Sequence, residues 1–230
     1  MTENITLKEL AGMVDHTLLR ADAKKEEFAK LCEEADSYGF KMVAINSFPV
    51  AMCRQFLKDS PVHVGAAIGF PLGQTTIENK VHEVKQSIAD GADEIDYVIN
   101  VGRLKDGDLA YIRREMTEIV SAAREGKILS KVILENCYLT DEEKVQVCEI
   151  AREVKPDFVK TSTGFGTGGA TLEDVRLMKQ TVGDAVKVKA AGGIRNLETA
   201  LNMVEAGAER LGTSSGIKIV SEYKDKFGDS

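Results

Sequence analysis

Eight short apolar runs alternate along the chain with longer segments of helical periodicity, and this alternation limits the available folds. The runs are rich in Val, Ile and Ala and are bounded by Gly, Pro or Asn, which is typical of buried parallel strands. The predicted strands are 14–19, 41–46, 62–69, 94–100, 131–136, 158–163, 186–191 and 210–213.

The intervening segments have the apolar spacing of helices. The predicted helices are 24–38, 50–57, 75–89, 108–123, 141–154, 172–181, 197–205 and 217–223, with a short helix near 6–12 and a flexible tail over 224–230. Several helices end at Gly39, Gly91, Pro156 or Gly207, just before the next strand. Glycine adopts left-handed backbone cheaply and proline cannot continue a helix, so the recurrence indicates repeated strand-helix units.

Repeated units of this kind form either an open doubly wound sheet or a closed barrel. The count of eight favours closure, and polar residues interrupt the strands toward their C-terminal ends, where barrel enzymes place their chemistry. The first strand is not followed by G-x-G-x-x-G, the fingerprint of dinucleotide-binding open sheets. We predict one α/β domain over residues 1–230, a (β/α)8 TIM barrel.

Charge and composition exclude several classes of protein. The net charge of -7 opposes binding to nucleic acid or to anionic membranes, and no run approaches the ~18 apolar residues of a membrane span. The N-terminus lacks a basic region followed by an apolar run, and the four cysteines form no C-x-x-C pair. The three histidines lack metal-ligand spacing. We expect a cytoplasmic protein without metal or cofactor.

A lysine interrupts an otherwise apolar strand in Phe158-Val-Lys160-Thr-Ser-Thr-Gly-Phe. Burial disfavours the ammonium form, and the resulting neutral amine can attack an aldehyde. The alternative is a lysine at a strand end that merely pairs with a carboxylate.

Two further strands carry charges that can reach Lys160. Lys187 and Lys189 share one face of the seventh strand, and Lys189 is the candidate because it lies nearer the C-terminal end. On the fourth strand, Glu94 and Asp96 share a face and could complete a proton relay. Glu135 could join them. For Glu94 and Glu135 a purely structural ion-pair network is the favoured alternative.

Glycines and hydroxyls follow the last two predicted strands, where barrels commonly bind phosphate on bare backbone N–H groups. The predicted cradle is formed by Gly192, Gly193, Gly212, Ser214 and Ser215. Glycine pairs also serve as plain turns, but two such loops in adjacent units favour phosphate.

Five motifs together resemble the deoxyribose-phosphate aldolase family, in order, between about residues 10 and 215. They are Asp15-His-Thr-Leu-Leu, Glu94-Ile-Asp96, Val159-Lys160-Thr-Ser-Thr-Gly, Lys189-Ala-Ala-Gly-Gly-Ile-Arg and Leu211-Gly-Thr-Ser-Ser. The resemblance implies a metal-independent class I aldolase that reversibly cleaves 2-deoxy-D-ribose 5-phosphate into acetaldehyde and D-glyceraldehyde 3-phosphate. It implies that Lys160 forms the Schiff base and that Lys189 is the second lysine, which perturbs Lys160 and helps to move protons. It also implies that Asp96 is the carboxylate of the proton relay. We also expect a homo-oligomer, because barrels of this kind often pair through their helices.

Two other functions compete with this interpretation. One is a different class I aldolase or a transaldolase, and the other is a non-catalytic sugar-phosphate-binding barrel, for which a desolvated lysine has little use. The chain also departs from some relatives, which carry a cysteine where Ala44 lies in the second strand. We therefore hypothesise that this site lacks the thiol that aldehyde adducts can trap.

Overall fold

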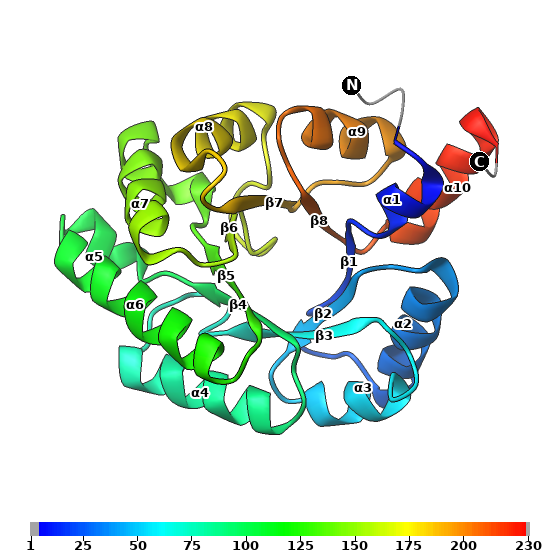
Figure 1. Ribbon diagram of the computed structural model, residues 1–230, viewed down its shortest axis with the longest axis horizontal. Coiled ribbons are helices and arrows are strands. Elements are labelled where there is room, and N and C mark those ends of the chain that lie inside the picture. The colour runs from blue at the N-terminus through cyan, green and yellow to red at the C-terminus, as the bar shows by residue number, and fades with distance from the viewer. Residues whose placement is uncertain (1–4, 229–230) are drawn as a thin grey trace.

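The computed structural model describes residues 5–228, and its eight parallel strands close into a barrel ringed by helices (Figure 1). β8 pairs with β1, Leu211 lying opposite Val14, which completes the ring. The strands are β1 (Val14–Leu18), β2 (Met42–Asn46), β3 (His63–Ile68), β4 (Glu94–Val98), β5 (Leu129–Ile133), β6 (Phe158–Lys160), β7 (Lys187–Ala191) and β8 (Arg210–Thr213). The predicted single-domain (β/α)8 barrel is confirmed.

Helices cover the outside of the barrel and connect successive strands. They are α1 (Leu7–Ala11), α2 (Lys25–Tyr38), α3 (Val50–Phe56), α4 (Ile77–Ala89), α5 (Val101–Lys105), α6 (Leu109–Glu125), α7 (Asp141–Val154), α8 (Leu172–Val182), α9 (Leu197–Glu205) and α10 (Gly216–Phe227). The short α5 and the 3-10 turn at Asn136–Tyr138 were not predicted, because single turns carry too little periodicity.

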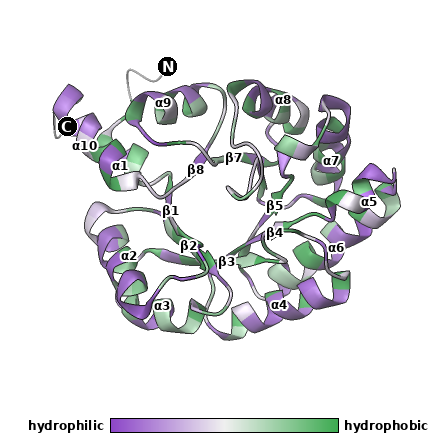
Figure 2. Cartoon of the chain, turned by 180° about the vertical axis from the view of Figure 1, so that it is seen from behind, coloured by the Kyte–Doolittle hydropathy of each residue, from purple (hydrophilic) through white to green (hydrophobic). Residues whose placement is uncertain are grey.

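The protein has two buried regions of different composition, one outside the ring of strands and one inside it. Ile95 and Tyr97 point outward and join a large apolar core between the strands and the helices. The alternate residues Glu94 and Asp96 point into the barrel, where they are also buried. Figure 2 shows that the surrounding helices carry both hydrophobic and hydrophilic segments, as expected of helices that pack one face against a sheet and expose the other.

Two strands, β5 and β6, end three residues earlier than predicted. β5 ends at Ile133, because Glu135 adopts a left-handed conformation with φ of 58° that turns the chain. β6 ends at Lys160, although Thr161 still donates a backbone hydrogen bond to Lys189 of β7. The buried Thr161–Thr163 segment therefore begins a loop at the mouth of the barrel.

Residues 224–227, where a flexible tail was expected to begin, form the last turn of α10. The rings of Tyr223 and Phe227, one turn apart, lie 5.0 Å from each other and extend the apolar face of the helix. Residues 229–230 of the expected tail lie outside the described residues.

Within residues 5–228 no helix is both long enough and apolar enough to cross a membrane. All four cysteines are free thiols, and Cys32, Cys53 and Cys148 are buried packing residues.

Candidate active site

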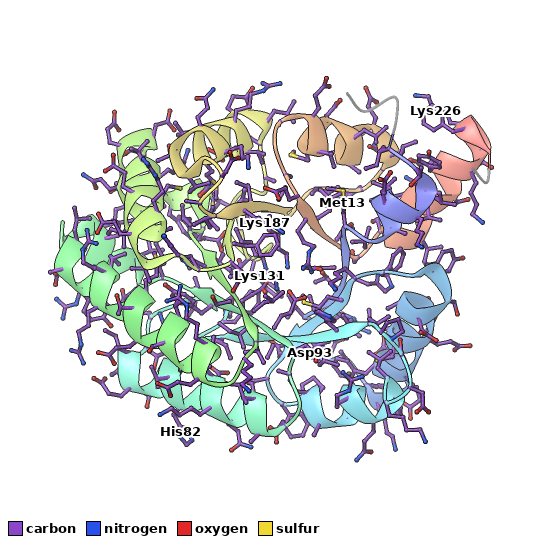
Figure 3. The ribbon with its side chains drawn as sticks, viewed as in Figure 1. Met13, His82, Asp93, Lys131, Lys187 and Lys226 are labelled. Atoms are coloured by element: carbon purple, nitrogen blue, oxygen red, sulfur yellow. The ribbon has the colours of Figure 1, made fainter. Side chains whose placement is uncertain are left out.

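Three buried lysines surround one carboxylate inside the barrel. Asp96 Oδ2 accepts hydrogen bonds from Lys160 Nζ at 2.8 Å and from Lys189 Nζ at 2.7 Å, and Asp96 Oδ1 accepts one from Lys131 Nζ at 2.6 Å. These side chains come from β4, β5, β6 and β7, so closure of the barrel brings them together. Figure 3 shows Lys131 within the ring of strands.

A second set of charges lies against this group. Asp15 Oδ2 is 2.5 Å from Lys189 Nζ, and Glu94 Oε2 is 2.6 Å from Lys131 Nζ. Arg210 joins the two carboxylates: it donates to Asp15 Oδ1 at 2.7 Å and to Glu94 Oε1 at 3.3 Å. All the charged groups in the barrel interior are therefore paired.

The seven charges do not balance if every group is ionised. Four cations (Lys131, Lys160, Lys189 and Arg210) face three carboxylates (Asp15, Glu94 and Asp96), which leaves one positive charge in excess. An uncompensated buried charge is costly, so loss of one proton from the set is favoured.

Lys160 is the group from which that proton is most readily lost. Burial lowers the pKa of Lys160 to about 8; Asp96 opposes the shift, and Lys189 and Lys131 add to it. Burial by itself would raise the pKa of Asp96, but Lys131, Lys160 and Lys189 together hold that pKa well below its usual value. For Lys131, Asp96 and Glu94 outweigh burial and raise the pKa. The cluster thus keeps Asp96 ionised and makes Lys160 the available amine.

Lys160 also faces the pocket at the mouth of the barrel. A pocket of about 490 Å³ is lined by Lys160 and by residues at or just after the C-terminal ends of β1, β6, β7 and β8. Four of the five predicted phosphate-binding residues line it: Gly192, Gly193, Gly212 and Ser214. Ser215 is half-buried just behind them, and its backbone N–H donates to Thr213 Oγ1 at 2.9 Å.

All three of these glycines are required by the local backbone or packing. Gly192 and Gly193 have φ of 86° and 81°, a conformation that other residues rarely adopt. A side chain at Gly212 would lie 2.9 Å from Ala191 Cβ and 3.2 Å from Lys189 Cε. Gly212 therefore makes room for Lys189, a packing requirement that exists whether or not phosphate binds there.

The structure separates the residues that the sequence left undecided. Lys187 is exposed at the other end of β7, with its Nζ over the Phe158 ring, whereas Lys189 is fully buried in the cluster. Glu135 lies apart from the lysines and accepts hydrogen bonds from the backbone N–H and the hydroxyl of Thr163. Glu135 thus holds the loop after β6 and is not part of the cluster.

No role in the site was predicted from the sequence for Lys131, Asp15 or Arg210. Lys131 was predicted to begin its strand, and strand alternation from it would have placed it on the same face as Ile133, inside the barrel. Arg210 opens β8 in the same way. A count of charged residues within predicted strands would have detected both, but not their partners.

The fold and this cluster define a (β/α)8 barrel built around a buried, deprotonatable lysine. The model of the DeoC/LacD family of aldolases matches residues 10–222, and the chain belongs to this family. The predicted resemblance is therefore confirmed.

Individual relatives agree with this assignment. A deoxyribose-phosphate aldolase of Lactobacillus acidophilus is 55% identical over 97% of this chain and 94% of its own length. One of Thermococcus gammatolerans is 55% identical over 92% of this chain and 95% of its own length. The solved tetrameric deoxyribose phosphate aldolase of Aeropyrum pernix superimposes with a TM-score of 0.89 at 32% identity, covering 95% of this chain and 92% of that chain.

Proposed function

We propose that the chain is a class I aldolase that reversibly cleaves 2-deoxy-D-ribose 5-phosphate into acetaldehyde and D-glyceraldehyde 3-phosphate, with Lys160 as the Schiff-base lysine. The observation that carries the proposal is the environment of Lys160: a buried amine with a pKa lowered to about 8, hydrogen-bonded to Asp96 and facing the pocket. The names of the relatives support the choice of substrate.

The first step forms the covalent intermediate. The neutral amine of Lys160 attacks C1 of the open-chain sugar, and loss of water gives an iminium ion. Lys189 lies 2.7 Å from the same oxygen of Asp96 that Lys160 contacts, so it can donate a proton to the departing hydroxyl while Asp96 holds both nitrogens in place.

The second step breaks the bond between C2 and C3. Asp96, directly or through a water molecule, accepts the C3 hydroxyl proton, and the bonding electrons move to the iminium nitrogen to give an enamine. D-Glyceraldehyde 3-phosphate leaves, the enamine is protonated at C2, and water hydrolyses the imine to release acetaldehyde and regenerate Lys160.

The phosphate is proposed to bind at Gly192, Gly193, Gly212, Ser214 and Ser215, of which the first four line the pocket together with Lys160. The backbone around Ser215 begins the twelve-residue helix α10, whose N-terminal N–H groups favour an anion. A local site of this kind is needed because the net charge of -7 repels anions at long range.

Two properties of the whole protein belong to the same proposal. We propose a homo-oligomer, supported by the tetrameric relative from Aeropyrum pernix, and size-exclusion chromatography with light scattering tests it. A cytoplasmic location is supported by the four free thiols, since disulfides are rare in that compartment.

The decisive experiment traps the intermediate. Acetaldehyde and sodium borohydride should leave an ethyl group on Lys160, detected by intact mass and peptide mapping, and Lys160→Leu should abolish it. An adduct on Lys189 would exchange the two lysine roles. Absence of any specific adduct, together with no turnover of 2-deoxy-D-ribose 5-phosphate, would reject the aldolase mechanism in favour of a non-catalytic sugar-phosphate-binding barrel.

A separate variant tests the phosphate site. Ser214→Asp places a negative charge in the lining of the pocket, so the KM for 2-deoxy-D-ribose 5-phosphate should rise by about 10- to 100-fold through repulsion. Trapping of acetaldehyde, which has no phosphate, should be unchanged. A KM equal to that of the wild type would place the phosphate elsewhere.

A further inference from the structure

Beneath the lysines, away from the pocket, Glu94 and Arg210 form a pair of opposite charges. Glu94 is fully buried and contacts Lys131, Arg210 and His63, whose Nδ1 lies 2.6 Å from Glu94 Oε1. Lys41 Nζ lies 3.1 Å from the other nitrogen of His63. Neither Glu94 nor Arg210 lines the pocket of about 490 Å³ that holds Lys160.

Each member of the pair reaches Asp96 through one lysine. Glu94 contacts Lys131, which donates to Asp96 Oδ1; Arg210 contacts Asp15, which contacts Lys189, which donates to Asp96 Oδ2. Lys160 is the third lysine on the same carboxylate. Lys131 and Lys189 compete with Lys160 for Asp96. A change in the interaction of Glu94 with Lys131, or of Asp15 with Lys189, therefore changes how strongly Asp96 interacts with Lys160.

We propose that Glu94 and Arg210 are positioning residues for the reaction, which act with opposite sign, through Lys131 and Asp15, on whether Lys160 is a free amine. The proposal rests on the assignment of Lys160 as the nucleophile. It gives a role in catalysis to two residues that do not line the pocket.

The signs follow from the contacts. Without the Glu94 charge, Lys131 binds Asp96 more strongly and the interior gains positive charge, so Lys160 loses its proton at lower pH. Without the Arg210 charge, Asp15 is left to Lys189 alone, Asp96 turns toward Lys160, and Lys160 keeps its proton to higher pH. A unit charge several ångströms away inside a protein is worth about one pH unit.

Charged groups on neighbouring strands face Lys160, Glu94 and Arg210. Lys160 faces Asp96 on β4, Lys131 on β5 and Lys189 on β7. Glu94 faces His63 on β3, Lys131 on β5 and Arg210 on β8, while Arg210 faces Asp15 on β1 and the Phe158 ring on β6. His63 contacts Glu94 through its Nδ1 atom. His63→Gln therefore serves as a check that it does not produce the shifts.

The experiment measures the rate of borohydride-trapped imine formation with acetaldehyde against pH. Relative to the wild-type midpoint, Glu94→Gln should shift the midpoint down by about one pH unit and Arg210→Met should shift it up by about the same amount. Arg210→Lys, which keeps the charge, should stay near the wild type. If Arg210→Met does not fold, Arg210→Gln replaces it with the same expected sign.

Glu115→Gln is the matched control, because Glu115 is an equally buried carboxylate whose lysine partner, Lys80, lies outside the barrel. Its midpoint should not move. Shifts of the same sign for Glu94→Gln and Arg210→Met, or lower rates without any shift, would overturn the proposal and leave the pair a structural one. Failure of the wild type to form the imine would instead reject the proposed function.

Discussion

The barrel interior and the layer between the sheet and helices α4 and α6 both bury lysines, but with different arrangements. In the outer layer Lys80 and Glu115 form one fully buried pair at 2.6 Å. Lys80 also donates to the Val98 carbonyl, and Glu115 accepts from the Asn100 N–H. In the barrel, three lysines share Asp96, and one of them faces a pocket.

The difference lies in charge balance and access. Burial lowers the pKa of Lys80 and raises the pKa of Glu115, and each partner opposes the shift of the other, so the pair is neutral overall and closed to ligands. The barrel cluster has an excess cation and an opening. A buried lysine thus becomes a nucleophile when its carboxylate is shared and a reactant can reach it.

The largest expected effect comes from removing the accessible lysine. Lys160→Leu should reduce cleavage of 2-deoxy-D-ribose 5-phosphate by about 10⁴-fold or more, because no covalent intermediate can form. Steady-state assays measure it, and Lys187→Leu is the matched control, since Lys187 is exposed on the neighbouring strand. Comparable losses in both variants would mean that position in the barrel, and not access to the pocket, makes a lysine essential.

Removing the closed lysine should affect folding instead. Lys80→Met leaves Glu115 as an uncompensated buried charge, so the free energy of unfolding should fall by about 3–5 kcal/mol, measured by urea denaturation. Imine formation per folded molecule should be unchanged. The double variant Lys80→Met/Glu115→Leu should recover most of the stability, and a double variant as unstable as the single one would contradict this account.

The rate of imine formation should depend on pH as the protonation of Lys160 does. Its pKa is lowered to about 8, so the amine is mostly protonated below that pH. The rate should rise about tenfold per pH unit between about pH 5 and 7 and level off above about pH 8, because well below the pKa each unit reduces the free amine tenfold. A rate independent of pH across this range would show that the amine is already free.

The smallest effect concerns Ala44, which shares the inner face of β2 with Met42. With no thiol at this position, prolonged exposure to crotonaldehyde should leave most activity intact, whereas Ala44→Cys should be inactivated. Activity after incubation, with mass mapping, measures this. Cys137, half-buried beside the loop after β6, is the thiol whose modification would contradict it, and Cys137→Ser is the control.

The barrel could be predicted from the sequence, because alternating periodicities and eight strand-like runs fix the repeated unit and its number. Alternation also predicted which charged residues share a face on two of the strands, Glu94 with Asp96 and Lys189 with Lys187. The nucleophile could be predicted because a lysine inside an apolar strand is conspicuous.

Which charged side chains meet in the barrel could not be predicted, because those contacts form only when the chain has folded. Asp15 and Arg210 are 195 positions apart and become partners because β8 closes on β1. Lys131 meets Asp96 from the adjacent strand, and Glu135 is turned away by a left-handed backbone conformation that no periodicity predicts. Periodicity reports the face of a strand on which a residue lies, whereas contacts and protonation depend on distances between strands that only closure of the barrel sets.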